Sequence, residues 1–83
     1  MSLLQGIHIA VWFDDGLPSR VVYDGKRYRV SDHPTRLEDE IAMLTHPLPI
    51  HGWRFQGTDS EHHALVFDIR ERGSEWELIR VYD

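Results

Sequence analysis

The carboxy-terminal stretch from His62 to Asp83 constrains the fold most, because it reads as two consecutive β-strands. His63, Leu65, Phe67 and Ile69 alternate with Ala64, Val66, Asp68 and Arg70. A period of two puts successive side chains on opposite faces of a strand. A second such run covers 75–82, after a polar turn that contains Gly73, which is free to take positive φ. The stretch therefore predicts a β-hairpin.

Both runs of this hairpin carry apolar groups on both faces. That distribution is typical of a sheet that curls on itself, so that neither face is fully wet. Burial of one large aromatic side chain contributes roughly 2–3 kcal/mol. We therefore expect Phe67 and Trp76 to be core residues.

Earlier parts of the chain show the same alternation. Residues 6–13 predict a first strand, and the turn-forming residues 14–18 predict a connection in which Pro18 excludes a helix. Asp24–Gly25 predicts a tight two-residue hairpin turn between strands at 20–24 and 26–30. In this second hairpin the expected buried residues are Val22, Tyr28 and Val30, and the expected exposed residues are Arg27 and Arg29.

Between the strands the period changes to that of a helix. Leu37, Ile41 and Leu44 form one apolar stripe, and Thr35 and Glu38 have the spacing of a capping box. His46 and Pro47 end this predicted helix, which is short enough to need docking on the sheet. Residues 53–56 predict one more strand, with Trp53 and Phe55 on one face.

These elements define the predicted fold class: mainly β (α+β), a small antiparallel curled sheet or partly open barrel of five to six strands with one short helix. The 83 residues make a single domain, 1–83. Residues 1–4 are expected to be a disordered leader or one added for expression.

Composition excludes several classes of protein. The chain has no cysteine, which excludes disulfides and thiolate metal sites, and 41% apolar residues argue against disorder. No apolar run is long enough to span a membrane, and we expect a cytoplasmic location. The net charge of −5 counts against a dedicated nucleic-acid binder, although five of nine basic residues lie between positions 20 and 36.

Catalytic signals are weak. The six histidines lack a ligand spacing, and His62 and His63 point to opposite faces if they lie on a strand, so no metal site and no cofactor are expected. The pairs Glu75/Glu77 and Asp14/Asp15 suit a solvated surface better than acid–base catalysis. No nucleophile elbow or glycine-rich phosphate loop is present. We therefore expect a protein that is not an enzyme.

Basic and aromatic residues alternate on two predicted strands. Cations that meet phosphates and rings that stack on bases are how small β-barrels bind single-stranded nucleic acid. The alternative is that the rings are core and the cations point outward, which strict alternation favours. The candidate binding residues are Lys26, Arg27, Arg29, Trp53, Arg54 and Phe55.

Two segments resemble a known family. Residues 25–30 (GKRYRV) and 76–83 (WELIRVYD) are similar to the "GRxYRV" and "W-x-L-x-x-V-Y-D" motifs of uncharacterised small bacterial domains of the actinobacterial type. Those domains also occur as a tail of proteins resembling Y-family polymerases. The resemblance covers roughly positions 17 to 83. It implies an accessory role near DNA repair and no catalytic residues.

Together these features predict a non-enzymatic interaction module. Its leading version recognises a protein partner or a second copy of itself through an exposed strand edge. The alternative is weak binding of single-stranded nucleic acid.

Overall fold

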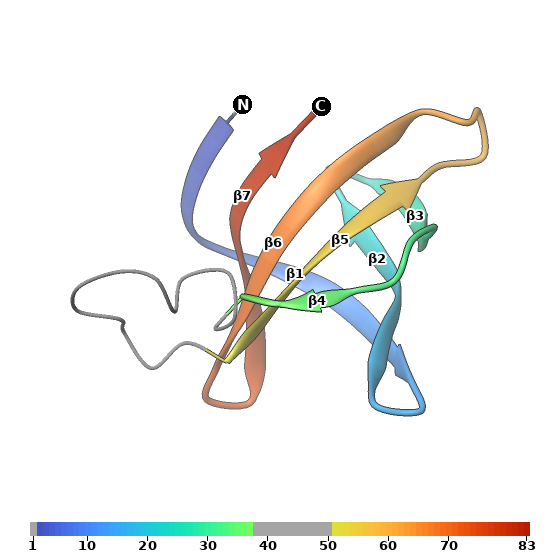
Figure 1. Cartoon of the computed structure of the whole chain (residues 1–83). Coiled ribbons are helices and arrows are strands. Elements are labelled where there is room, and N and C mark those ends of the chain that lie inside the picture. Colours follow the sequence, from blue (N-terminus) through green and yellow to red (C-terminus); the bar gives the residue numbers. More distant parts are fainter. Residues whose placement is uncertain (1, 38–50) are drawn as a thin grey trace.

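The computed structural model describes residues 2–37 and 51–83, with side chains for 8–37 and 51–83. Within these residues it contains seven strands (Figure 1). They are β1 (Ser2–Asp14), β2 (Leu17–Tyr23), β3 (Lys26–Val30), β4 (Thr35–Arg36), β5 (Gly52–Thr58), β6 (Ala64–Arg72) and β7 (Glu75–Tyr82).

The strands form a closed antiparallel barrel. The order is β3-β2-β1-β7-β6-β5-β4, and an additional pairing of β3 with β5 joins the two halves. Arg29 pairs with Thr58 and Val30 with Gly57 at this closing seam. Six strands therefore make the barrel. The short β4 is an extra strand, which pairs with residues 53–54 of β5, whereas β3 pairs with residues 57–58. The prediction of a mainly β, barrel-like fold is confirmed, and the barrel is closed rather than partly open.

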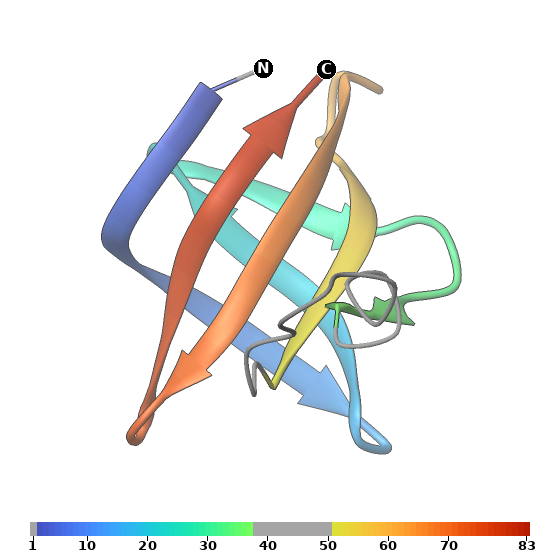
Figure 2. The ribbon, with the colours of Figure 1, turned by 60° about the vertical axis from the view of Figure 1, so that its left-hand side comes forward.

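Tight turns connect the hairpins. Asp24 and Gly25 both have positive φ, 53° and 76°, as the predicted two-residue turn requires. Gly73 has φ 65° in the predicted β6–β7 turn. A third turn of the same kind lies at Asp15–Gly16, with φ 54° and 81°, so β2 begins already at Leu17. The β1–β2 and β6–β7 turns lie at the same lower end of the barrel (Figure 2).

The barrel interior is filled by side chains that alternate inward. The fully or nearly fully buried residues are Val21, Tyr28, Phe55, Phe67, Ile69, Leu78 and Val81. The prediction of Val22 as a buried residue is wrong. Val21 is the inward-facing residue, opposite Val11 and Tyr28, whereas Val22 lies opposite Arg27 on the outer face. A shift of one residue exchanges the faces of a whole strand.

Two sequence predictions, for the start of the helix at Thr35 and for the leader at residues 1–4, differ from the structure. Thr35 does not cap a helix, because it belongs to β4 and pairs with Arg54. The remainder of the predicted helix falls mostly on residues 38–50, outside the described residues. β1 begins at Ser2, so residues 2–4 of the predicted leader are strand, and Ser2 pairs with Val81 of β7.

Candidate functional site

The outer face of β1–β3 combines an exposed ring with arginines. Trp12, Arg20 and Arg29 lie side by side across the three strands, because Trp12 pairs with Arg20 and Arg20 with Arg29. Residues directly opposite one another in an antiparallel sheet share a face. Arg27 lies on the same face one row away, next to Val22. We call Trp12, Arg20, Arg27 and Arg29 the outer basic face.

Trp12 is unusually open for a tryptophan, with 45% of its surface exposed. The Arg20 guanidinium lies 5.6 Å from the centre of its ring, close enough for a cation–π contact. Two shallow depressions border Trp12. One of about 270 Å³ includes Arg20 and Arg27, and one of about 420 Å³ includes Arg20 and Arg29.

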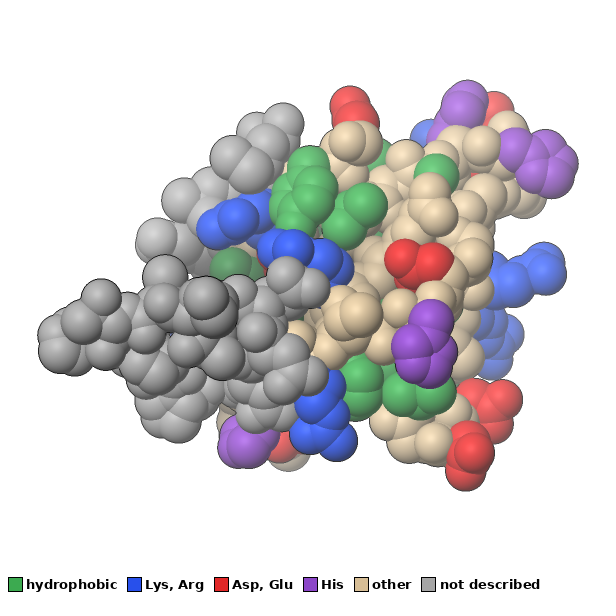
Figure 3. Space-filling view, viewed as in Figure 1, with side chains coloured by type: hydrophobic (Ala, Val, Ile, Leu, Met, Phe, Trp, Pro, Cys, Tyr) green, Lys and Arg blue, Asp and Glu red, His purple; other side chains and the backbone are tan. Residues whose placement is uncertain are grey.

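One acid, Asp14, lines the 420 Å³ depression together with Arg20 and Arg29. Within the described part of the chain, no carboxylate lies at ion-pair distance from Arg20, Arg27 or Arg29. The space-filling view shows Lys and Arg side chains projecting on the side of β2 and β3 (Figure 3). Exposed cations around a ring match the chemistry of a phosphate backbone and its bases.

A second feature is a groove of about 540 Å³ at the lower mouth of the barrel. Three rings line it, from Phe13 in β1, Trp53 in β5 and Trp76 in β7. The rings of Phe13 and Trp76 are 5.0 Å apart between centres. Trp53 pairs with the inward-facing Ile69, and Trp76 with Ile9, so both tryptophans belong to the last inward-facing layer before the barrel opens.

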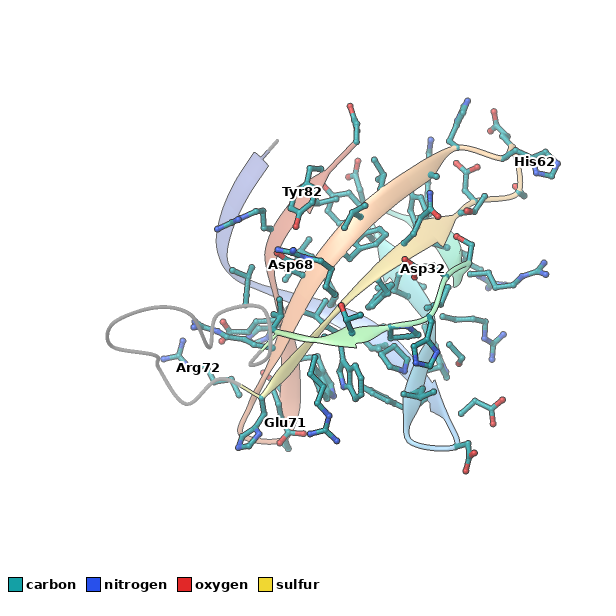
Figure 4. The ribbon with its side chains drawn as sticks, in the orientation of Figure 1. Asp32, His62, Asp68, Glu71, Arg72 and Tyr82 are labelled. Atoms are coloured by element: carbon teal, nitrogen blue, oxygen red, sulfur yellow. The ribbon has the colours of Figure 1, made fainter. Side chains whose placement is uncertain are left out.

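Polar groups complete this groove. The Arg36 guanidinium lies 5.4 Å from the centre of the Trp53 ring, on the adjacent strand. Glu71 lies directly opposite Trp76 in the β6–β7 hairpin, and its backbone N–H donates to the carbonyl of His51 at 2.8 Å. Figure 4 shows Glu71 at this lower end of the molecule. We call Phe13, Arg36, His51, Trp53, Glu71 and Trp76 the mouth groove.

The outer basic face and the mouth groove meet at consecutive residues. The β1–β2 register shifts between Trp12 and Phe13. Phe13 lines both the 420 Å³ depression beside Trp12 and the mouth groove. Aromatic and basic side chains therefore follow one continuous path from β3 around to the mouth of the barrel.

The predicted binding residues are divided among different places. Lys26, Arg27 and Arg29 are exposed on β3, and Trp53 is half-buried in the mouth groove. Phe55 has no exposed surface, so it is a core residue that cannot contact a ligand on the outside.

Arg54 has a structural partner instead. Its Nε and Nη2 donate to the two carboxylate oxygens of Asp68 at 2.8 and 3.0 Å. The Tyr82 hydroxyl also donates to Asp68, at 3.1 Å, and both residues lie on the outer side of β6 and β7 (Figure 4). Arg54 therefore stabilises a buried carboxylate on β6, away from the outer basic face of β1–β3.

Several residues of the outer basic face and the mouth groove were not among the predicted binding candidates: Trp12, Phe13, Arg20, Arg36, His51, Glu71 and Trp76. A signal was present for Trp12, because alternation placed it on the face opposite Val11 and Phe13. Nothing in the sequence showed that this face would look outward, or that Arg20 would lie beside the ring.

A second acid on the outer side of the β5–β7 sheet is also held by arginines. Glu77 is 2% exposed and accepts hydrogen bonds from Arg70 at 3.3 Å and Arg72 at 3.2 Å. Burial alone raises the pKa of Glu77, but the hydrogen bonds and charges of the two arginines outweigh it and lower the pKa below its usual value. This ionic cluster is structural and lies apart from the outer basic face.

Other kinds of site find no support in the described residues. No group of three or more His, Asp or Glu side chains within 8–37 and 51–83 is arranged to hold a metal ion. Among the described residues, no helix has the length and apolar character to cross a membrane.

Comparison with known proteins does not assign the chain. A scan against protein-family models gave no match, and searches of curated proteins and of solved structures gave none either. The resemblance in residues 25–30 and 76–83 therefore stays a prediction from sequence.

Proposed function

We propose that this chain is a non-catalytic binding module that holds single-stranded nucleic acid on the outer basic face. The observation that carries the proposal is Trp12, a ring with 45% of its surface exposed among three arginines that have no carboxylate partner in the described residues. Stacking of a base on an aromatic ring contributes about 1–3 kcal/mol whatever the base. Arginines beside the ring supply the contacts to phosphates.

Two further features support this proposal. The path of aromatic and basic side chains continues from Trp12 through Phe13 into the mouth groove, which gives an extended strand more than one stacking position. The net charge of −5 is a sum over the whole chain, whereas Arg20, Arg27 and Arg29 form no ion pair within the described residues. Local charge next to the ligand matters most, since salt screens interactions beyond about 10 Å.

The geometry favours this function over recognition through a strand edge. Pairing of β3 with β5 closes the barrel, and β4, the strand at the end of the order, has two residues. A closed barrel offers little edge for strand addition. The link to DNA repair depends only on the family resemblance and stays a prediction.

The test is fluorescence anisotropy with a labelled thymine oligonucleotide. Contact with three arginines predicts a binding constant that falls roughly twentyfold between about 50 and 200 mM salt. Trp12→Ala should weaken binding by roughly fivefold or more, and Arg29→Ala should weaken it and reduce the salt dependence. The control is Arg72→Ala, which removes the same charge from β6, where Arg72 donates to Glu77. Absence of binding at low salt, or equal losses in Arg29→Ala and Arg72→Ala, would contradict the proposal.

A second candidate function is association through the apolar patch itself. Trp12 and the neighbouring Phe13, 39% exposed, are the large apolar side chains that the described surface leaves most open. Exposed apolar patches often mark protein interfaces. Light scattering across a concentration series distinguishes the two functions: a dimer that Trp12→Ala converts to monomer, without nucleic-acid binding, favours association.

A further inference from the structure

The mouth groove contains an acid where a nucleic-acid site would be expected to contain only cations. Glu71 lines the groove and is exposed. A carboxylate beside a phosphate backbone is unfavourable unless it accepts hydrogen bonds from the ligand. The position of Glu71 therefore bears on which base the groove accepts, an inference that rests on the proposed function.

Glu71 and Trp76 are positioned to act on the same base. They are directly opposite each other in β6 and β7. Opposite residues in an antiparallel pair share a face and have Cβ atoms about 4.5–5.5 Å apart. A base that stacks on the Trp76 ring therefore brings its edge within reach of the Glu71 carboxylate, while Phe13, 5.0 Å from Trp76 between ring centres, borders the same space.

The chemistry of the carboxylate selects among the bases. A carboxylate has two acceptor oxygens and no donor. Guanine carries two neighbouring donors, N1–H and the N2 amine, on its Watson–Crick edge. Adenine and cytosine each place an acceptor next to their amine, and thymine places its single N–H between two carbonyls. Guanine alone can make two parallel hydrogen bonds to a carboxylate in this way.

We infer that the mouth groove is a guanine-selective base site, in which Trp76 stacks the base and Glu71 accepts hydrogen bonds from N1–H and the N2 amine. The Arg36 guanidinium, 5.4 Å from the centre of the Trp53 ring, places a positive charge in the same groove. The outer basic face holds the adjoining strand without base preference.

The test compares labelled thymine oligonucleotides that carry one central guanine, inosine, adenine or thymine. Inosine lacks only the N2 amine. The guanine oligonucleotide should bind roughly five- to tenfold more tightly than the all-thymine one, and inosine should lose much of that advantage. Glu71→Gln should bring the guanine-to-thymine ratio toward one. Glu61→Gln, the same change in net charge in the loop between β5 and β6, should leave the ratio as in the unmodified protein.

The outcomes separate the two proposals. Binding of every oligonucleotide with equal affinity, or a guanine preference that survives Glu71→Gln, overturns the guanine site and leaves single-strand binding in place. Binding of none of them overturns the proposed function, and the base site with it.

Discussion

Arg54 holds Asp68 through two parallel hydrogen bonds, from Nε and Nη2 to the two carboxylate oxygens, at 2.8 and 3.0 Å. The two residues are directly opposite each other on β5 and β6. The Asp68 side chain is only 4% exposed, and Arg80 lies opposite it on β7. A buried carboxylate in this position needs its partners, because water does not replace them.

Arg54→Ala should destabilise the barrel by about 2 kcal/mol or more, because it leaves the buried Asp68 without its bidentate partner. Arg29→Ala removes an exposed arginine that has no ion pair among the described residues, and it should change the free energy of unfolding by less than about 0.5 kcal/mol. Urea denaturation of both variants measures the difference. Equal stabilities for the two variants would show that the Arg54–Asp68 pair contributes nothing net.

Glu77→Gln should lower stability at neutral pH much more than in acid. The pKa of Glu77 is lowered in the folded protein, so its contribution is present above the ordinary glutamate pKa of 4.5 and is lost as the pH falls through the folded value. Denaturation at neutral pH and again well below 4.5 tests this sign. Glu61→Gln, at an exposed position, is the control. A loss of stability in Glu77→Gln that is as large in acid as at neutral pH would contradict a lowered pKa of Glu77.

Gly57→Ala should destabilise the core by about 1–3 kcal/mol through overpacking. A Cβ atom at Gly57 would lie 2.8 Å from Cε2 of Phe67 and 3.0 Å from Cβ of Tyr28. Thermal unfolding of Gly57→Ala, Phe67→Leu and the double variant forms a mutant cycle. We expect the Phe67→Leu change to cost less in the Gly57→Ala background than in the unmodified protein, and strict additivity would argue against this contact.

In an alkaline titration, Tyr28 and Tyr82 should ionise at a higher pH than an ordinary tyrosine. Burial raises the pKa of both hydroxyls above the usual 10.0, and Asp59 raises that of Tyr28 further, as Asp68 does for Tyr82. Their contribution to stability is therefore present below about pH 10 and is lost as the pH rises through the folded values. Phenolate absorbance in the folded and denatured protein measures the shift. Tyr82→Phe should remove part of the late-ionising signal, and an unchanged titration curve would contradict the assignment.

Strand positions were predictable because alternation and turn chemistry are local. The turns at Asp24–Gly25 and Gly73, the inward-facing Phe67, and the exposed Arg27 and Arg29 follow from a period of two and from residues that accept positive φ. Val22 was misjudged because it is adjacent to Val21, and only the pairing of Val21 with Tyr28 shows which of the two valines turns inward.

The candidate site was much less predictable. Residues of β1, β4, β5, β6 and β7 meet in the mouth groove, and the contact of Arg20 with Trp12 depends on the register of two strands. Arg54 and Arg29 each stand next to a buried aromatic residue in an alternating strand. Arg54 is nevertheless held by the buried carboxylate of Asp68, whereas Arg29 is exposed to solvent.

By itself the sequence determined an antiparallel β domain with hairpins at known turns and a core of alternating apolar residues, since each of these depends on neighbours along the chain. Only the tertiary structure decided that the sheet closes through β3 and β5, and that Trp12, Phe13 and Trp76 form one surface. The physical reason is that closure and cross-strand register depend on how distant strands pack together. A periodic pattern tells which side chains share a face, but not which faces finally meet.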